Sequence, residues 1–316
     1  MFRPGAYFSP GKLLLSGEYL VLRGAKCLSL PTRFGQHLQV ETADEPCIEW
    51  RVQDREDKVL YESSWTLHGQ LIESSGAAWD EQVRRTLKAV LKQGKQERGV
   101  RLRFQLDHPS EWGLGSSATL VANIARATHT DALELFFATQ KGSGYDVATS
   151  FQAAPLFYWL EDGVGRWEKV DFDPPFKTHL FFVYLGQKQD SASEVTRFSA
   201  LDIPSSDVSA VSEWTDIMHA SKRLKPFTEA CRSHEALLSK LIQRPTVQDR
   251  LFPDFPGVVK SLGAWGGDFV MAAADEPSEA ESYFNKKGYP VCLSFSDIFR
   301  TDHQRDDDQR ARILER

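Results

Sequence analysis

The stretch Glu111-Trp112-Gly113-Leu114-Gly115-Ser116-Ser117-Ala118-Thr119-Leu120 places two glycines and two serines directly before an apolar, helix-forming segment. Glycine can adopt positive φ and lets the backbone approach a ligand closely, and the first amides of a helix direct donors and the positive dipole end at an anion. The stretch therefore predicts a phosphate-binding loop. The alternative is a glycine-rich turn in which a serine caps an ordinary helix.

Regular elements are expected on both sides of this loop. Residues 100–106 alternate apolar and polar side chains, which is typical of a strand, and residues 80–93 carry Val83, Leu87, Val90 and Leu91 on one helical face. Further strands are expected at 12–15, 19–22, 38–42, 155–159 and 180–185, with helices around 207–243 and a last strand near Val291. Two early hairpin-like strands would give a mixed sheet.

Composition is that of an ordinary globular protein. Of its residues, 41% are hydrophobic and 26% are charged. The length of 316 residues exceeds the usual size of a domain with one hydrophobic core, which predicts two domains. Gly163, Gly165, Pro174 and Pro175 place the boundary near residue 175. No apolar run is long enough to span a membrane and the first residues do not resemble a signal peptide, so a cytoplasmic location is expected.

Charge, cysteine and histidine usage exclude several classes of function. The net charge of −6 argues against nonspecific nucleic-acid binding. Four scattered cysteines without a Cys-x-x-Cys pair fit reduced, mostly buried thiols, and the eight histidines lack the spacing of zinc ligands. The sequence does not predict an oligomeric state.

Two further glycine-containing segments flank the central loop, Ser9-Pro10-Gly11-Lys12 near the start and Lys260-Ser261-Leu262-Gly263-Ala264-Trp265-Gly266-Gly267-Asp268 near the end. Together the three resemble the motifs of the GHMP kinase superfamily, which includes galactokinase, homoserine kinase, mevalonate kinase and phosphomevalonate kinase. The resemblance is nearest to the phosphomevalonate and mevalonate kinase branch, because Gly17-Glu18-Tyr19 follows the first segment and residues 141–148 contain Gly-Ser-Gly-Tyr-Asp.

This resemblance implies an α+β chain with the two-domain GHMP kinase fold. An ATP-binding domain similar to domain 2 of ribosomal protein S5 is expected at residues 1–175, and a ferredoxin-like domain at 176–316. The implied activity is an ATP- and Mg²⁺-dependent kinase of a small anionic molecule, mevalonate or phosphomevalonate, in isoprenoid precursor synthesis. The alternatives are a sugar or amino-alcohol kinase of the same superfamily, or a catalytically silent nucleotide-binding regulator.

Lys12 and Asp146 are the expected catalytic residues. A flexible ammonium can stabilise the transferring phosphoryl group or lower the pKa of the acceptor hydroxyl, and a carboxylate on a glycine-rich loop can accept that hydroxyl's proton. The alternatives are a surface lysine at the start of a strand and an aspartate that caps the helix after it.

The nucleotide and its Mg²⁺ are expected at the glycine loops. The cofactor-binding candidates are Gly113, Leu114, Gly115, Ser116, Ser117, Ala118, Gly263, Gly266 and Gly267. Ser117 is the candidate for the hydroxyl at Mg²⁺, and Glu134, on the helix before the aspartate loop, is the nearest candidate for a second ligand. An exposed helical glutamate is the alternative for Glu134.

The acceptor is expected to contact residues of both expected domains. The substrate-binding candidates are Glu18, Ser143, Gly144, Tyr145, Lys188, Ser191 and Ser193. Glu18 has packing or a buried hydrogen bond as its alternative role, and Lys188 with the two serines could instead form a polar loop at a strand end. The Trp265 indole either covers the bound nucleotide or substrate, or is an aromatic side chain of the core.

Overall fold

The computed structural model describes residues 1–187, 191–263, 265 and 267–299, and it has the predicted α+β composition. Contacts divide the chain into two compact units. Unit 1 comprises Met1–Lys12, Phe34–Ser110 and Leu114–Ala153, and unit 2 comprises Leu13–Arg33, Glu111–Gly113 and the chain from Ala154 onward. The predicted domain boundary near residue 175 is a single cut in the sequence, whereas these units are defined by contacts and each combines several ranges. The boundary stays a prediction.

Unit 1 is built on a mixed sheet. Its strands are β3 (Cys47–Gln53), β4 (Val59–Thr66), β5 (Leu71–Ser74), β6 (Val100–Leu106) and the second half of β2 (Cys27–Thr42), in the order β5-β4-β3-β6-β2. Strand β1 (Gly5–Ser16) pairs with β2. The parallel pair β3–β6 makes the sheet mixed, while β2–β6, β3–β4 and β4–β5 are antiparallel. The mixed sheet thus arises from this pair and not from two early hairpin strands.

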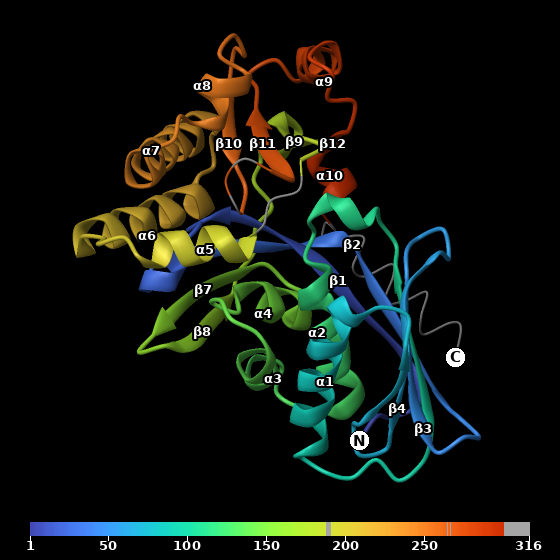
Figure 1. Cartoon of the computed structure of the whole chain (residues 1–316). Helices are drawn as coiled ribbons and strands as arrows, with labels where there is room; N and C mark the ends of the chain where they lie inside the picture. Colours follow the sequence, from blue (N-terminus) through green and yellow to red (C-terminus); the bar gives the residue numbers. More distant parts are fainter. Residues whose placement is uncertain (188–190, 264, 266, 300–316) are drawn as a thin grey trace. The chain divides into compact units, whose positions relative to one another are not determined.

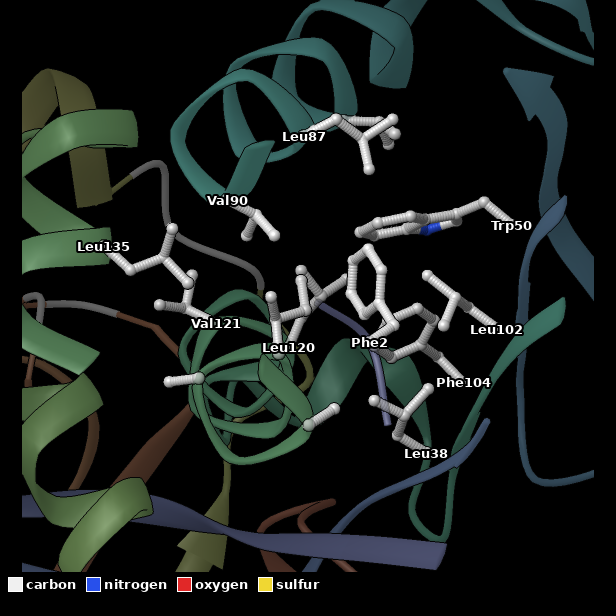
Figure 2. Packing of buried hydrophobic residues seen from close by; sticks show 14 of the residues in the cluster. Phe2, Leu38, Trp50, Leu87, Val90, Leu102, Phe104, Leu120, Val121 and Leu135 are labelled. Carbon is white, nitrogen blue, oxygen red and sulfur yellow. The ribbon is translucent and has the colours of Figure 1, made fainter. Parts of the chain in front are cut away.

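Four helices of unit 1 complete its core. They are α1 (Ala77–Leu91), α2 (Ser116–Thr128), α3 (Ala132–Thr139) and α4 (Tyr145–Gln152). Figure 2 shows Trp50, Leu102 and Phe104 of the strands on one side of the cluster, and Leu87, Val90 and Leu120 of the helices on the other. The strict alternation of β6 and the helical spacing in α1 both place their apolar residues in this core, as predicted.

Unit 2 contains a second, antiparallel sheet. Its strands are β9 (Leu180–Tyr184), β10 (Val258–Ser261), β11 (Phe269–Ala273) and β12 (Cys292–Ser294), in the order β10-β11-β9-β12. The first half of β2 pairs with the hairpin of β7 (Leu156–Glu161) and β8 (Val164–Lys169). The helices are α5 (Ser191–Ser199), α6 (Ser205–Ala220), α7 (Leu224–Ile242), α8 (Val247–Leu251), α9 (Pro277–Lys286) and α10 (Phe295–Ile298). Helices α6 and α7 lie side by side (Figure 1).

Three short 3₁₀ helices, η1 (Leu20–Arg23), η2 (Ser110–Trp112) and η3 (Lys177–His179), complete the secondary structure of the described residues. Across that part of the chain, none of the helices combines the length and apolar character that a membrane crossing requires. Cys27 and Cys231 are buried, Cys47 and Cys292 are partly buried, and all four are free thiols, as expected.

The strand predicted at 19–22 is wrong. Gly17 and Tyr19 both have positive φ, which turns the chain sharply, and η1 follows in place of an extended segment. Leu20 and Val21 are nevertheless buried, and Leu20 packs in a cluster with Phe198 of α5. A short apolar run indicates burial but does not by itself distinguish a strand from a helical turn.

Candidate active site

The central glycine loop ends at the amino terminus of α2. Gly115 is the N-cap, with a φ of 89° that glycine adopts without strain. Ser116 and Ser117 are the first two residues of the helix, and no side chain in the described chain caps this helix end. The alternative of a serine-capped turn is therefore wrong. The first amides of α2 are left for an external acceptor.

Lys12 lies across this helix end. Its backbone N–H donates to the carbonyl oxygen of Leu114 at 2.9 Å. Its side chain runs so close to Gly115 that a Cβ atom there would lie 2.9 Å from Cε of Lys12. The ammonium nitrogen is 5.7 Å from the centre of the Tyr145 ring, within the range of a cation–π contact. Lys12 is half-buried in this arrangement, so it is not a lysine on an open surface.

The aspartate loop begins α4 in the same manner. Gly144, with a φ of 83°, is the N-cap, and Tyr145 and Asp146 are the first residues of the helix. The Asp146 carboxylate accepts the N–H of Val147 at 2.9 Å, within the first turn, where the helix dipole favours an anion. The N-cap position considered as the alternative role of Asp146 thus belongs to Gly144. Ser143, just before the cap, is buried.

Unit 1 therefore brings three of the predicted segments to one place, those that contain Lys12, Gly115 and Tyr145. Helices α2 and α4 pack on each other, and the Lys12 side chain touches Gly115 at the start of α2 and reaches Tyr145 at the start of α4. Two helix amino termini and one ammonium group lie here beside the Asp146 carboxylate, and the free amides and the ammonium can hold an anion.

Arg126 is a structural residue of this site that sequence reasoning missed. Its guanidinium donates to the hydroxyl of Ser9 at 3.2 Å and to the carbonyl oxygen of Phe151, and it lies 4.7 Å from the centre of the Phe151 ring. Arg126 thus connects α2, the end of α4 and the strand that carries Lys12. No sequence motif surrounds Arg126, so only the fold reveals this connection.

Gly113, the first glycine of the central loop, lies in unit 2 against Asp268. A Cβ atom at Gly113 would fall 2.1 Å from an oxygen of the Asp268 carboxylate. Asp268 has a φ of 49°, and its backbone N–H donates to Gln187 at 2.7 Å. Asp268 is the last residue of the late segment, and no sequence pattern predicts a role for it.

The late glycine segment is described in part. Gly263 has a φ of 66° and Gly267 is buried, whereas Gly266 lies outside the described residues. Trp265 is only 3% exposed, and it packs in the same cluster as Tyr19 and Phe198. The core position considered for Trp265 is therefore the one that the structure shows.

Glu18 does not have the open position expected of a substrate-binding residue. Its side chain is 0% exposed, and Oε1 accepts a hydrogen bond from Nζ of Lys260 at 2.5 Å. Nε2 of His234 lies 3.2 Å from Oε2. The expected substrate contact is corrected to a buried ion pair, because a carboxylate enclosed in this way has no surface to offer a ligand.

Glu18, His234 and Glu235 lie around Lys260 in this buried cluster, together with the Cys231 thiol. Burial disfavours the Lys260 ammonium, but the carboxylates of Glu18 and Glu235 outweigh it and raise the pKa of Lys260. Burial lowers the pKa of His234 well below its usual value, and its Nε2 accepts the N–H of Gly17 at 3.0 Å, as neutral imidazole can. Burial raises the pKa of Glu235 to about 8, although the nearby Lys260 ammonium acts to lower it.

The Glu235 carboxyl makes stability depend on pH. Because its pKa is raised on folding, the folded state binds its proton more tightly, and this contribution to stability is lost as the pH rises from about 4.5 through about 8. We expect Glu235→Gln to melt at a temperature close to that of the unmodified protein at pH 5, and roughly 5 °C above it at pH 9. Thermal melts across this range test the prediction.

Glu229→Gln is the matched control, because Glu229 is exposed on the same helix, α7. Its melting temperature should follow that of the unmodified protein at every pH. If the curves of Glu235→Gln and the unmodified protein stayed parallel from pH 5 to pH 9, Glu235 would not titrate in this range.

The remaining predicted residues fall outside this geometry. Lys188 lies outside the described residues, as do the side chains of Ser191 and Ser193 in α5. Ser117 is exposed in the first turn of α2, whereas Glu134 is exposed in the first turn of α3, which begins beyond the other end of α2. A helix of this length spans about 20 Å, so the two do not form an evident ligand pair. Among the described residues, no group of three or more His, Cys, Asp or Glu side chains is arranged to hold a metal.

The fold is shared with solved kinase structures. No protein-family model and no curated protein matches this sequence. Mevalonate kinase of Methanococcus jannaschii is 18% identical with a TM-score of 0.68, over 92% of this chain and 97% of that one. Phosphomevalonate kinase of Streptococcus pneumoniae, in complex with phosphomevalonate and AMPPNP, is 16% identical with a TM-score of 0.68, over 92% and 99%. Galactokinase of Lactococcus lactis, complexed with galactose, is 14% identical with a TM-score of 0.65, over 92% of each.

These likenesses define the class of fold. The chain has the fold of the GHMP kinases, as the three glycine-containing segments implied. Because kinases of different acceptors share it, the fold does not select the acceptor, which has to be argued from the site.

Proposed function

We propose that the chain is an ATP- and Mg²⁺-dependent kinase of a small anionic metabolite. The observation that carries the proposal is the position of Lys12, whose side chain reaches from the amino terminus of α2 to that of α4. Phosphoryl transfer requires positive groups around the transferring phosphoryl and a base near the acceptor hydroxyl. Lys12, the amides of α2 and Asp146 are groups of these kinds.

The central loop fits the triphosphate of ATP. Its glycines leave space that side chains would fill, since a Cβ at Gly113 would meet Asp268 and a Cβ at Gly115 would meet Lys12. The first amides of α2 lie at a helix end that no side chain caps. We assign the β- and γ-phosphates to the segment from Gly113 to Ala118. Gly263, Gly266 and Gly267 are proposed to border the same nucleotide.

Mg²⁺ would supply charge neutralisation between the phosphates when bound. It prefers few protein ligands together with phosphate oxygens and waters, and the exposed Ser117 hydroxyl in the first turn of α2 suits that role. Glu134 remains the proposed second ligand from the sequence, although its position beyond the far end of α2 does not favour it.

Asp146 and Lys12 divide the chemistry between them. With a hydroxyl acceptor such as mevalonate, the Asp146 carboxylate accepts the hydroxyl proton as that oxygen bonds to the terminal phosphorus of ATP, and the bond from this phosphorus to ADP breaks so that ADP leaves. With phosphomevalonate the attacking atom is an oxygen of its phosphate. In both cases Lys12 stabilises the negative charge that spreads over the phosphoryl oxygens. The first turn of α4 holds Asp146 in place, because its carboxylate already accepts the Val147 N–H. Ser143, Gly144 and Tyr145 are proposed to line the acceptor beside it.

Mevalonate or phosphomevalonate is the proposed acceptor, which would place the enzyme in isoprenoid precursor synthesis. The Gly-Glu-Tyr and Gly-Ser-Gly-Tyr-Asp segments support this branch. Lys188, Ser191 and Ser193 are the proposed partners of the acceptor's negative charge.

ATP-dependent ADP release with a panel of acceptors tests this function. We expect mevalonate or phosphomevalonate to be used faster than homoserine, galactose and a heptose phosphate, with a phosphorylated product detected by mass spectrometry. Preference for galactose would overturn the mevalonate-type assignment and leave the kinase proposal intact. Binding of Mg·ATP without ADP release on any acceptor would favour the silent regulator.

Replacing Gly115 with valine is expected to abolish nucleotide binding. A valine would be strained at a φ of 89°, and its Cβ would lie 2.9 Å from Cε of Lys12, which displaces the lysine and closes the loop. Saturating Mg·ATP, at about 100 times its Kd, should stabilise the unmodified protein by about 2.7 kcal/mol and leave the melting temperature of Gly115→Val unchanged.

Gly288→Val is the matched control, because Gly288 has a φ of 90° and an added Cβ would meet no atom within 4 Å. It imposes the same backbone strain away from the loop, so it should keep the shift with Mg·ATP. A full shift in Gly115→Val, or none in the unmodified protein, would refute the assignment of the phosphate loop.

A further inference from the structure

The late glycine segment begins beside the buried ion pair of Lys260 and Glu18. Lys260 is the third residue of β10, and besides Glu18 its ammonium donates to the carbonyl oxygen of Ser261 at 2.9 Å. Lys260 therefore links Glu18 to the backbone at the point where β10 leads into the segment.

Tyr19 contacts the same segment further along the chain, at Trp265. The backbone N–H of Trp265 donates to the Tyr19 hydroxyl at 2.9 Å, and the Tyr19 ring stacks on Phe198 at 5.1 Å between centroids. Tyr19 holds a φ of 58°, an uncommon conformation for a residue of this size. The turn from Gly17 to Tyr19 thus contacts the late segment at two separate points.

Stability alone does not explain why charges occupy this position. Lys260 and Glu18 are both 0% exposed, so both have lost their hydration. Replacement of a buried ion pair by uncharged side chains of similar volume is often neutral or stabilising, whereas removal of one partner is strongly destabilising. Unlike an apolar contact, the pair fixes the orientation of the groups that it joins, because its hydrogen bonds have specific geometry.

We propose that Glu18 and Lys260 are positioning residues that hold the described residues of the late glycine segment, from Ser261 to Gly263 and Trp265, in the conformation that accepts the nucleotide. The proposal rests on the kinase function proposed above, in which that segment borders ATP. Tyr19 acts with the pair through its hydrogen bond to Trp265. None of the three touches the nucleotide, and their effect is on the conformation of the segment.

The double variant Glu18→Gln/Lys260→Met separates positioning from stability. Each single variant leaves one buried charge without its nearest partner, and we expect melting temperatures roughly 10 °C lower. The double variant contains no charge at either site and should recover to within about 3 °C. Its KM for ATP is nevertheless expected to stay about tenfold higher, with kcat reduced less than about threefold, because ground-state binding and not the chemical step is affected.

Lys287→Met/Asp254→Asn is the matched control, since it removes an exposed ion pair of 2.9 Å in the same unit. It should leave the KM for ATP unchanged. Tyr19→Phe is a milder variant that keeps the stacked ring and loses only the hydroxyl, and it should raise the KM about threefold, as the loss of one hydrogen bond does. Tyr19→Phe keeps the proposal testable if the charge variants do not fold.

A second readout does not depend on activity. In protein labelled with 5-fluorotryptophan, the ¹⁹F resonance of Trp265, assigned with Trp265→Phe, should shift or broaden in the double variant and in Tyr19→Phe. Failure of the proposed function would show as a lack of ATP turnover in the unmodified protein, with this resonance still responding. An unchanged KM and an unchanged resonance in a stably folded double variant or in Tyr19→Phe would overturn the proposal.

Discussion

Asp146→Asn is expected to lower kcat by a factor of ~10² or more, while the Kd for Mg·ATP changes less than about threefold. Asparagine has the size of aspartate, and its side-chain oxygen can still accept the N–H of Val147, so the first turn of α4 should stay intact. What is lost is the carboxylate that accepts the proton of the acceptor hydroxyl. Steady-state kinetics with the best acceptor and calorimetric binding of AMPPNP measure the two quantities.

Asp131→Asn is the matched control for this change. Asp131 caps the neighbouring helix α3, where its side chain accepts the N–H of Glu134 at 2.8 Å, so the same chemical change is made at another helix start in unit 1. We expect kcat within about twofold of that of the unmodified protein. If Asp146→Asn retained comparable activity, Asp146 would serve only the helix.

Sequence patterns predicted the elements whose own residues determine their structure. The strand at 100–106 and the helix near 80–93 have regular periodicities, and the structure confirms both as β6 and α1. The segment at 19–22 was mistaken for a strand because its burial depends on residues such as Phe198 and Leu238, which are distant in the sequence. A four-residue apolar run does not contain that information.

The candidate site was predictable to the extent that local motifs define it. Gly115 and Gly144 mark two helix starts, and the structure places the Lys12 side chain between them. The pairing of Glu18 with Lys260 was not predicted, because 242 positions separate the two residues. No local pattern states which lysine a given glutamate will meet, so such a pair becomes visible only in the folded chain.

Lys12→Met is expected to lower kcat by a factor of ~10² while the KM for ATP rises less than about fivefold. Methionine keeps most of the apolar stem that packs across Gly115, so the loop should retain its conformation, but it carries no charge above the Tyr145 ring. The loss should fall on kcat, because negative charge on the transferring group is greatest in the transition state. The same kinetic assay separates the two parameters.

Two further variants define what Lys12 contributes. Lys92→Met removes an exposed lysine at the carboxyl end of α1, in the same unit, and should leave both parameters unchanged. Lys12→Arg keeps the charge but replaces a compact ammonium by a planar fork of different geometry, and an intermediate loss of about tenfold is expected. If Lys12→Met lost no more activity than Lys92→Met, the ammonium would have no catalytic role, and the positive charge for phosphoryl transfer would have to come from the helix amino termini and the metal alone.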